Sequence, residues 1–231
     1  PRWFMEKIIG IHRKKMLPDF SFYTFEKWSS KMGLIRENEK AETVLFQTCY
    51  VQHNEPQIGK DTLEVLEKNK VDCACLKGLR CCGMPAWEQG DLETLRVNAK
   101  HNLEILIPFV EKGSKVLVIN PTCSMMMRRE YKNLLEGEDR DRAKILSEAV
   151  NDPSEYLWNI RSEERFNTDV KSSPNLTISY HAPCHLRAQG IGFKGRDLIK
   201  KITGSKVKTV MECCGHDGTY AMKEESFDAS K

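Results

Sequence analysis

The chain has 231 residues, 40% of them hydrophobic and 30% charged, with a formal net charge of +3 and a mean hydropathy of −0.52. This length can bury a core without disulfide support, and no apolar run approaches the roughly 18 residues that a membrane span needs. The small, dispersed charge argues against nucleic acid as a partner. Nine cysteines, an odd number, fit metal or redox chemistry in a reducing cytoplasm better than a disulfide framework.

Residues 1–40 are predicted to form an N-terminal helical arm. Basic residues stand beside aromatic and aliphatic ones here, namely Trp3, Phe4, Lys7, Ile8, Arg13, Lys14, Phe20 and Phe22. Such a mixture suits a docking or membrane-surface segment, and the alternative is a helix and loop that pack on the body of the protein. The predicted location is the cytoplasm, with peripheral contact at the inner face of the cytoplasmic membrane left open.

Residues 41–172 are predicted to hold a first α/β unit and a charged connector. Short apolar runs predict strands, and helical spacing with an Asp91 cap predicts a long helix that Pro108 bends or ends. The expected strands lie at 44–49, 71–76 and 115–120, and the expected helices at 61–68 and 91–108. This alternation is typical of a parallel α/β sheet.

Residues 173–231 are predicted to repeat this plan as a second unit. Strands are expected at 176–181 and 207–211 with a helix at 195–202 between them. The pair Cys81-Cys82 follows Cys49 after 31 residues, and Cys213-Cys214 follows Cys184 after 28 residues. A glycine, which can take a positive φ, follows each pair, so internal duplication is the economical explanation.

The key cysteines all follow predicted strands. Cys49, Cys123 and Cys184 come after apolar runs, at the position where parallel sheets place ligands. Thiolates from separate loops suit an iron–sulfur cluster or a structural zinc. Zinc sites usually take paired thiolates from a Cys-x2-Cys turn, which is absent here, whereas adjacent cysteines can each meet a different iron. An iron–sulfur cluster is therefore favoured, and zinc is the alternative.

The cysteine pattern resembles the duplicated cysteine-rich CCG domain. This domain is shared by the B subunit of heterodisulfide reductase, the iron–sulfur subunit of glycolate oxidase, lactate-utilisation iron–sulfur proteins and the C subunit of anaerobic glycerol-3-phosphate dehydrogenase. The amino-acid sequence between the cysteines is most similar to that of the last of these proteins. The phrases that carry the resemblance are Thr48-Cys49-Tyr50-Val51, Cys81-Cys82-Gly83-Met84-Pro85-Ala86, Pro121-Thr122-Cys123-Ser124, Tyr180-His181-Ala182-Pro183-Cys184-His185 and Gly215-His216-Asp217-Gly218-Thr219-Tyr220.

The resemblance implies an electron-transfer subunit of an oxidoreductase complex. Electrons would pass from an FAD-containing dehydrogenase subunit of glycerol-3-phosphate, glycolate or lactate type, with other iron–sulfur subunits, through one or two clusters of 4Fe-4S type to a quinone or a similar acceptor. The implied metal ligands are Cys49, Cys81, Cys82, Cys123, Cys184, Cys213 and Cys214.

The chain departs from the family pattern at two places. Met126 stands where the full motif has a fifth cysteine, which favours a simpler cluster in the first unit. The second unit has no distal Cys-x2-Cys before Lys231, so we expect either a degenerate second site or a longer parent chain.

Several assignments stay open from the sequence alone. Cys73 and Cys75 are either extra ligands or buried apolar thiols. His185 and His216 are candidates for proton donation or for hydrogen bonds that tune a cluster. A heterodisulfide-reductase-like thiol–disulfide reductase is one alternative function, and a zinc-stabilised assembly module is another.

Overall fold

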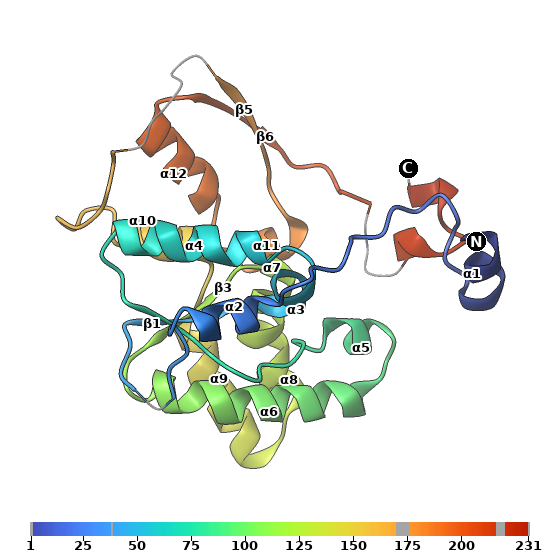
Figure 1. The fold of residues 1–231 in the computed structure, drawn as a ribbon, viewed down its shortest axis with the longest axis horizontal. Coiled ribbons are helices and arrows are strands. Elements are labelled where there is room, and N and C mark those ends of the chain that lie inside the picture. Colours follow the sequence, from blue (N-terminus) through green and yellow to red (C-terminus); the bar gives the residue numbers. More distant parts are fainter. Residues whose placement is uncertain (1, 38, 170–175, 216–219, 231) are drawn as a thin grey trace.

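The computed structural model describes residues 2–37, 39–169, 176–215 and 220–230. It contains a four-stranded parallel sheet in the order β2-β1-β3-β4 and a two-stranded parallel sheet, β5-β6 (Figure 1). The strands are β1 (Thr43–Phe46), β2 (Cys73–Cys75), β3 (Lys115–Val118), β4 (Val150–Asn151), β5 (Thr177–His181) and β6 (Lys206–Val210). The predicted α/β class with two parallel-sheet units is confirmed.

Helices precede, connect and follow these strands. They are α1 (Arg2–Ile9), α2 (Phe25–Lys31), α3 (Thr48–His53), α4 (Pro56–Lys68), α5 (Met84–Glu88), α6 (Leu92–Val110), α7 (Pro121–Met125), the π-helix η1 (Met126–Glu130), α8 (Tyr131–Leu134), α9 (Gly137–Ala149), α10 (Pro153–Asn159), α11 (Cys184–Ala188), α12 (Lys194–Thr203) and the 3-10 turns η2 (Tyr220–Met222) and η3 (Asp228–Ser230). Within the described ranges, no helix combines the length and apolar character that a bilayer crossing requires.

The larger sheet is buried on both faces, as parallel sheets usually are. Successive side chains of a strand point to opposite faces. Val44 and Phe46 therefore enter the core that α6 and α9 cover, whereas Leu45 enters the core that contains Phe25 of α2 and Leu66 of α4. Figure 1 shows these two layers of helices on opposite sides of the sheet. The three-layer arrangement fixes the strand ends that carry the cysteines.

Helix α6 begins after the predicted cap, Asp91, and ends two residues beyond the predicted end at residue 108. The Asp91 carboxylate accepts the backbone N–H of Thr94 at 3.1 Å. The predicted apolar face is buried, with Leu95, Ala99, Leu103 and Leu106 fully covered. The helix runs past Pro108 to Val110, because a proline so near the C-terminus removes only one backbone hydrogen bond of the last turns.

The charged stretch predicted as a connector is part of the first unit. Helix α9 buries Ala143 and Leu146 against the core that α6 covers, and β4 pairs with β3. Helix α10 then starts in a capping box formed by Asp152 and Glu155. A two-residue strand has too short a pattern to be recognised from sequence. The boundaries at residues 41 and 173 stay predictions.

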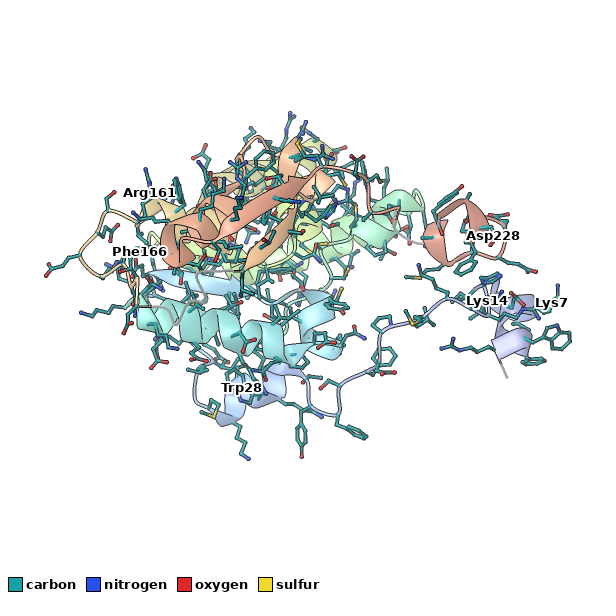
Figure 2. All side chains as sticks on the ribbon, turned by 90° about the horizontal axis from the view of Figure 1, so that it is seen from above. Lys7, Lys14, Trp28, Arg161, Phe166 and Asp228 are labelled. Atoms are coloured by element: carbon teal, nitrogen blue, oxygen red, sulfur yellow. The ribbon has the colours of Figure 1, made fainter. Side chains whose placement is uncertain are left out.

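The N-terminal arm divides into two parts with different environments. Helix α2 packs on the body, with Phe25 only 1% exposed. Residues 10–12 instead pair with the C-terminal segment, where Glu224 donates its N–H to Gly10 at 2.7 Å and the His12 ring stacks on Phe227. Figure 2 shows Lys7, Lys14 and Asp228 together, apart from the body of the protein. The packing interpretation therefore holds for α2 but not for α1.

Candidate metal centre

Four cysteines of the first unit lie at one edge of the larger sheet. Strand β1 has β2 and β3 as parallel neighbours, so the carboxyl ends of all three strands meet there. Cys49 lies in the first turn of α3 after β1, and Cys123 lies in α7 after β3. Cys81 and Cys82 lie in the loop between β2 and α5. The sequence prediction that these residues gather beyond the strand ends is confirmed.

The four thiols interact one after another. The thiols of Cys49 and Cys82 both lower the pKa of Cys81, and the thiols of Cys123 and Cys81 both raise the pKa of Cys82. All four are free thiols rather than disulfides. Cys82 is 3% exposed and Cys123 is 5% exposed, whereas Cys49 is open to solvent. The set therefore extends from the protein interior to its surface.

Cys81 is the member of this set that most readily becomes a thiolate. Its pKa lies well below the usual range because its sulfur accepts hydrogen bonds from the thiols of Cys49 and Cys82 and from the backbone N–H of Gly83. The pKa of Cys49 is raised because its thiol is hydrogen-bonded to Cys81 and is partly desolvated. That of Cys82 is raised by its hydrogen bonds to Cys123 and Cys81 and by burial. A thiolate is the form that binds metal.

Two buried polar side chains hold the backbone of the Cys81-Cys82 loop. Asn102 of α6 is fully buried, accepts the N–H of Arg80 at 2.9 Å and donates to the Arg80 carbonyl at 3.2 Å. The hydroxyl of Tyr131, which is also fully buried, donates to the carbonyl of Cys82 at 2.9 Å. Sequence reasoning missed both. Asn102 was detectable as a polar residue on the otherwise apolar face of the predicted helix.

The backbone takes left-handed conformations beside two of the cysteines. Thr48, directly before Cys49, has φ +66°, which is rare for a β-branched residue and indicates strain that the surrounding fold maintains. Gly83, directly after Cys82, has φ +90°, and a Cβ atom there would lie 3.0 Å from the Leu95 side chain. The predicted role of this glycine, to permit a positive φ, is confirmed.

A small cavity opens between Cys49 and Cys81. Its volume is about 40 Å³, and Gln47 and His53 are among the residues that line it. The Oε1 atom of Gln47 is buried and has no hydrogen-bond partner among the described residues. A buried amide oxygen without a partner costs free energy, so its retention beside the thiols is consistent with a polar group or ion that binds there.

Cys73 and Cys75 lie elsewhere and behave as core residues. They occupy alternate positions of β2 and pack on the sheet face opposite the Cys82 core, together with Phe25 and Leu117. Burial raises the pKa of each thiol to about 12, so both are held as neutral thiols. The structure thus favours buried apolar thiols over extra ligands.

The second unit repeats the placement of its cysteines with less burial. Strands β5 and β6 are parallel neighbours, with His181 paired to Val210, so Cys184 and the Cys213-Cys214 pair follow strand ends at one edge. All three thiols are exposed. His185 extends to the first unit, where its Nδ1 atom lies 2.8 Å from Thr122 Oγ1. His216, the other candidate proton donor, lies outside the described residues.

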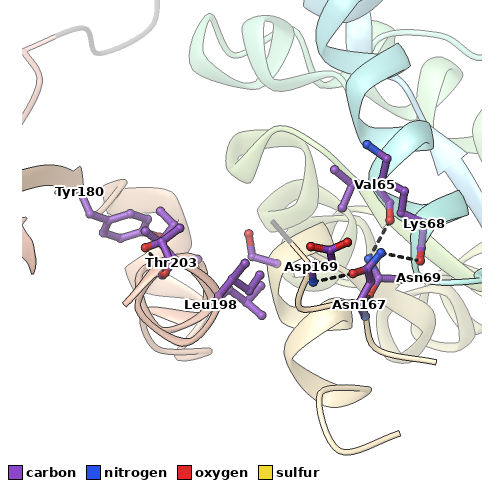
Figure 3. Close-up of a pocket in the computed structure, with 12 residues that line it drawn as sticks. Val65, Lys68, Asn69, Asn167, Asp169, Tyr180, Leu198 and Thr203 are labelled. Atoms are coloured by element: carbon purple, nitrogen blue, oxygen red, sulfur yellow. Dashed lines mark hydrogen bonds between the residues drawn. The ribbon is translucent and has the colours of Figure 1, made fainter. Parts of the chain in front are cut away.

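A large groove has no cysteine among its lining residues. It has a volume of about 830 Å³ and lies between α4, α10 and α12. Figure 3 shows Tyr180, Leu198 and Thr203 on one wall and Val65 and Asn69 on the other. Among the described residues that line it, Asp169 is the one common metal-binding side chain, and the groove is separate from the four cysteines of the first unit.

The donor set of the first unit consists of thiols alone. Within the described part of the chain, no three His, Cys, Asp or Glu side chains converge closely enough to hold one metal ion. A structural zinc needs four donors around one point, whereas a cluster can be bound by thiolates that each meet a different metal atom. Four thiols from separate loops are the type of donor set that iron–sulfur clusters take.

The comparison with protein families shows which family the chain belongs to. The cysteine-rich domain model named CCG matches residues 43–128 and again residues 178–231. The chain belongs to the CCG cysteine-rich domain family. The first match covers β1 to β3 and the second covers β6 and nearly all of β5, so the CCG domain is present twice, as the repeated cysteine pattern predicted.

This CCG protein is similar in sequence to subunits and proteins of two bacteria. It is 28% identical over 232 residues to the C subunit of anaerobic glycerol-3-phosphate dehydrogenase of Escherichia coli strain K12, an alignment that covers 100% of this chain and 57% of the relative. The chain thus spans little more than half of that protein. It is also 28% identical over 189 residues to lactate utilization protein A 2 of Bacillus cereus strain AH820. This alignment covers 79% of this chain and 75% of the relative.

Proposed function

We propose that this CCG protein is an electron-transfer subunit of an oxidoreductase complex, in which Cys49, Cys81, Cys82 and Cys123 hold an iron–sulfur cluster. The observation that carries the proposal is the series of four interacting thiols at the carboxyl ends of three parallel strands. Four cysteine ligands are the usual number for a 4Fe-4S cluster. The names of the relatives, a dehydrogenase subunit and a lactate utilization protein, support the same class of function.

The residues around such a cluster would have different roles. A bound cluster would supply one-electron chemistry. Cys82 and Cys123 provide buried ligands that exclude water, while the exposed Cys49 leaves one side open to a partner. Asn102 and Tyr131 keep the Cys81-Cys82 backbone fixed. Cys184, Cys213 and Cys214 are proposed as ligands of a second centre.

The proposed partners follow from the same role. We propose that an FAD-containing dehydrogenase subunit, together with other iron–sulfur subunits, donates electrons to this protein. A quinone or a similar acceptor would then take the electrons from it. Cys49 and the three cysteines of the second unit are exposed residues, so electrons would have short access to the protein surface there.

Elemental analysis of anaerobically purified protein tests the proposal. We expect iron and acid-labile sulfide in nearly equal amounts, and an EPR signal that appears when the protein is reduced. A colourless protein that contains zinc and no sulfide would overturn electron transfer and support the assembly-module alternative. The ratio of iron to chain would also show whether one or two centres are filled.

We also propose that α1 contacts an anionic membrane surface. Its apolar residues Trp3, Phe4 and Ile8 are each more than half exposed, and Lys7 lies beside them. Aromatic residues beside basic ones are typical of helices that lie in the membrane interface. The contact would be peripheral.

Vesicle flotation tests this contact. We expect the protein to float with vesicles that contain an anionic lipid, and the double variant Trp3→Ser/Phe4→Ser to lose most of this binding. The control Val97→Ser/Ile145→Ser removes exposed apolar side chains from α6 and α9, which do not belong to the arm, and should bind as the wild type does. Equal binding by both variants, or none by the wild type, would contradict the proposal.

A further inference from the structure

A groove on the surface of the first unit combines aromatic and basic side chains. It has a volume of about 740 Å³ and lies between the segment before α2, α2 itself, and the turn from α3 into α4. The aromatic residues that line it are Phe20, Phe22, Tyr23 and Trp28, and the lysines are Lys27, Lys31 and Lys60. Figure 2 shows Trp28 on the body of the protein, apart from Lys7 and Lys14 of the arm.

The segment before α2 is fixed to the body, yet its aromatic side chains are uncovered. The N–H of Ser21 donates to the His53 carbonyl at 2.7 Å, and Asn54 Nδ2 donates to the Asp19 carbonyl at 2.8 Å. The three aromatic residues of this segment are nevertheless at least 73% exposed, namely Phe20, Phe22 and Tyr23. Exposed aromatic residues that gather on a fixed surface are typical of a site that a partner covers.

The charge of the groove is mostly positive. Its charged lining residues are three lysines and one acid, Glu55. Lys27 and Lys31 are four residues apart in α2, so they lie on one face of the helix. The carboxylate of Glu26, on the same helix, accepts the N–H of Gly78 at 2.8 Å. Among the described residues, no ion pair neutralises any of the three lysines.

We propose that this groove is the docking site for an acidic segment of a partner protein, with aliphatic or aromatic side chains between its carboxylates. The carboxylates would pair with Lys27 and Lys31, and the apolar side chains would cover Phe22. Lys60 Nζ lies 5.3 Å from the centre of the Trp28 ring, so a cation and an aromatic surface already stand side by side in the groove. Charge complementarity of this kind selects acidic partners over neutral or basic ones.

The groove adjoins the exposed end of the candidate metal centre. Helix α3 carries Cys49 in its first turn, and Asn54, directly after its last turn, lines the groove. Five residues of a helix span about 8 Å, so a partner docked in the groove would lie close to Cys49. That this partner exchanges electrons with the protein rests on the proposed function.

The shape of the groove favours a protein segment over a membrane surface. The lining residues come from a loop and three helices that surround a hollow, which an extended chain can fill. A flat bilayer surface would leave the hollow empty. The helix proposed to contact the membrane, α1, lies apart from α2 and α3 (Figure 1).

Selection from a library of random displayed peptides tests the proposal on the full chain. We expect the peptides selected by the wild type to be acidic and to contain aliphatic or aromatic residues. One of them, labelled with fluorescein, then serves as the probe in fluorescence anisotropy. Its dissociation constant should rise about tenfold in Lys27→Glu/Lys31→Glu, where attraction becomes repulsion, and about tenfold in Phe22→Ser, which removes an apolar contact.

Matched controls separate the groove from general effects of charge and hydropathy. Lys200→Glu/Lys201→Glu makes the same change of net charge on α12 of the second unit, and Ile145→Ser removes an exposed apolar side chain from α9. Both should bind the peptide as the wild type does. Selected peptides that are neutral or basic, or that bind the groove variants as tightly as the controls, would overturn the proposal.

Two further measurements distinguish the remaining explanations. The groove variants should float with anionic vesicles as the wild type does, and a loss of flotation without any selected peptide would assign the groove to the membrane instead. Iron without a selected peptide would overturn the docking site and leave the proposed function intact. Binding of acidic peptides by a protein without iron would overturn the proposed function and leave the docking site.

Discussion

The Cys82→Ala variant is expected to lose the iron and sulfide of the first centre. Cys82 is the third of the four interacting thiols and connects Cys81 to Cys123. Because it is buried, no water or exposed side chain can replace its sulfur as a ligand. Iron and sulfide per chain, measured after anaerobic purification, should fall by the whole share of one centre, and the corresponding EPR signal should disappear.

Cys75→Ala is the matched control for this experiment. Cys75 is as well buried as Cys82, at 1% exposure, but packs in the core on the opposite face of the sheet. Both substitutions remove one buried sulfur, so their direct effects on packing should be similar. Wild-type iron content in Cys75→Ala with loss in Cys82→Ala supports the proposed ligand set. Equal iron loss in the two variants would instead indicate a general loss of structure.

Gly83→Ala is expected to lower the free energy of unfolding by about 2 to 4 kcal/mol. Part of the cost is the left-handed conformation at φ +90°, which any Cβ atom disfavours by roughly 1–2 kcal/mol. The remainder is overpacking, because the new Cβ would lie 3.0 Å from Leu95 Cγ and 3.4 Å from Leu95 Cα. The shift of the adjacent Cys82 should also reduce iron occupancy. Urea denaturation of the metal-free protein measures the first effect.

Two further variants separate the contributions. Gly90 has φ +75°, but a Cβ atom added there would have no other atom within 4 Å, so Gly90→Ala should cost only the conformational part, about 1 kcal/mol. Leu95→Ala removes the 3.0 Å contact with Cγ and keeps those with Cα and Cβ, so in this background Gly83→Ala should cost less than it does in the wild type. A Gly83→Ala protein as stable as Gly90→Ala would show that the loop relaxes without strain.

Local patterns were sufficient to predict most elements of the fold. The strand at Lys115–Val118 is a run of β-branched and aliphatic residues, and the spacing of Leu95, Ala99, Leu103 and Leu106 defines the buried face of α6. Strand β4 was missed because two residues, Val150 and Asn151, contain no periodicity. Its existence depends on the free edge of β3, which is a property of the assembled sheet.

The residue types of the candidate site and their order along the chain were predictable, but the role of each cysteine was not. The sequence places Cys73 and Cys75 within an expected strand and the other thiols after strands, but it leaves open whether these two are extra ligands or buried apolar thiols. The pleat of β2 decides the matter, because it turns them into the core beyond the opposite face of the sheet. Asn102 and Tyr131 became recognisable only when their partners in the Cys81-Cys82 loop were known.

The sequence by itself determined the α/β class, the duplication and the placement of each key cysteine after a strand, because these depend on periodicity and spacing along the chain. Only the tertiary structure decided which thiols interact, and that α11 of the second unit packs on α7 of the first. Thr122 and His185 meet because helix packing brings together residues that are distant in sequence, and no local pattern encodes that contact.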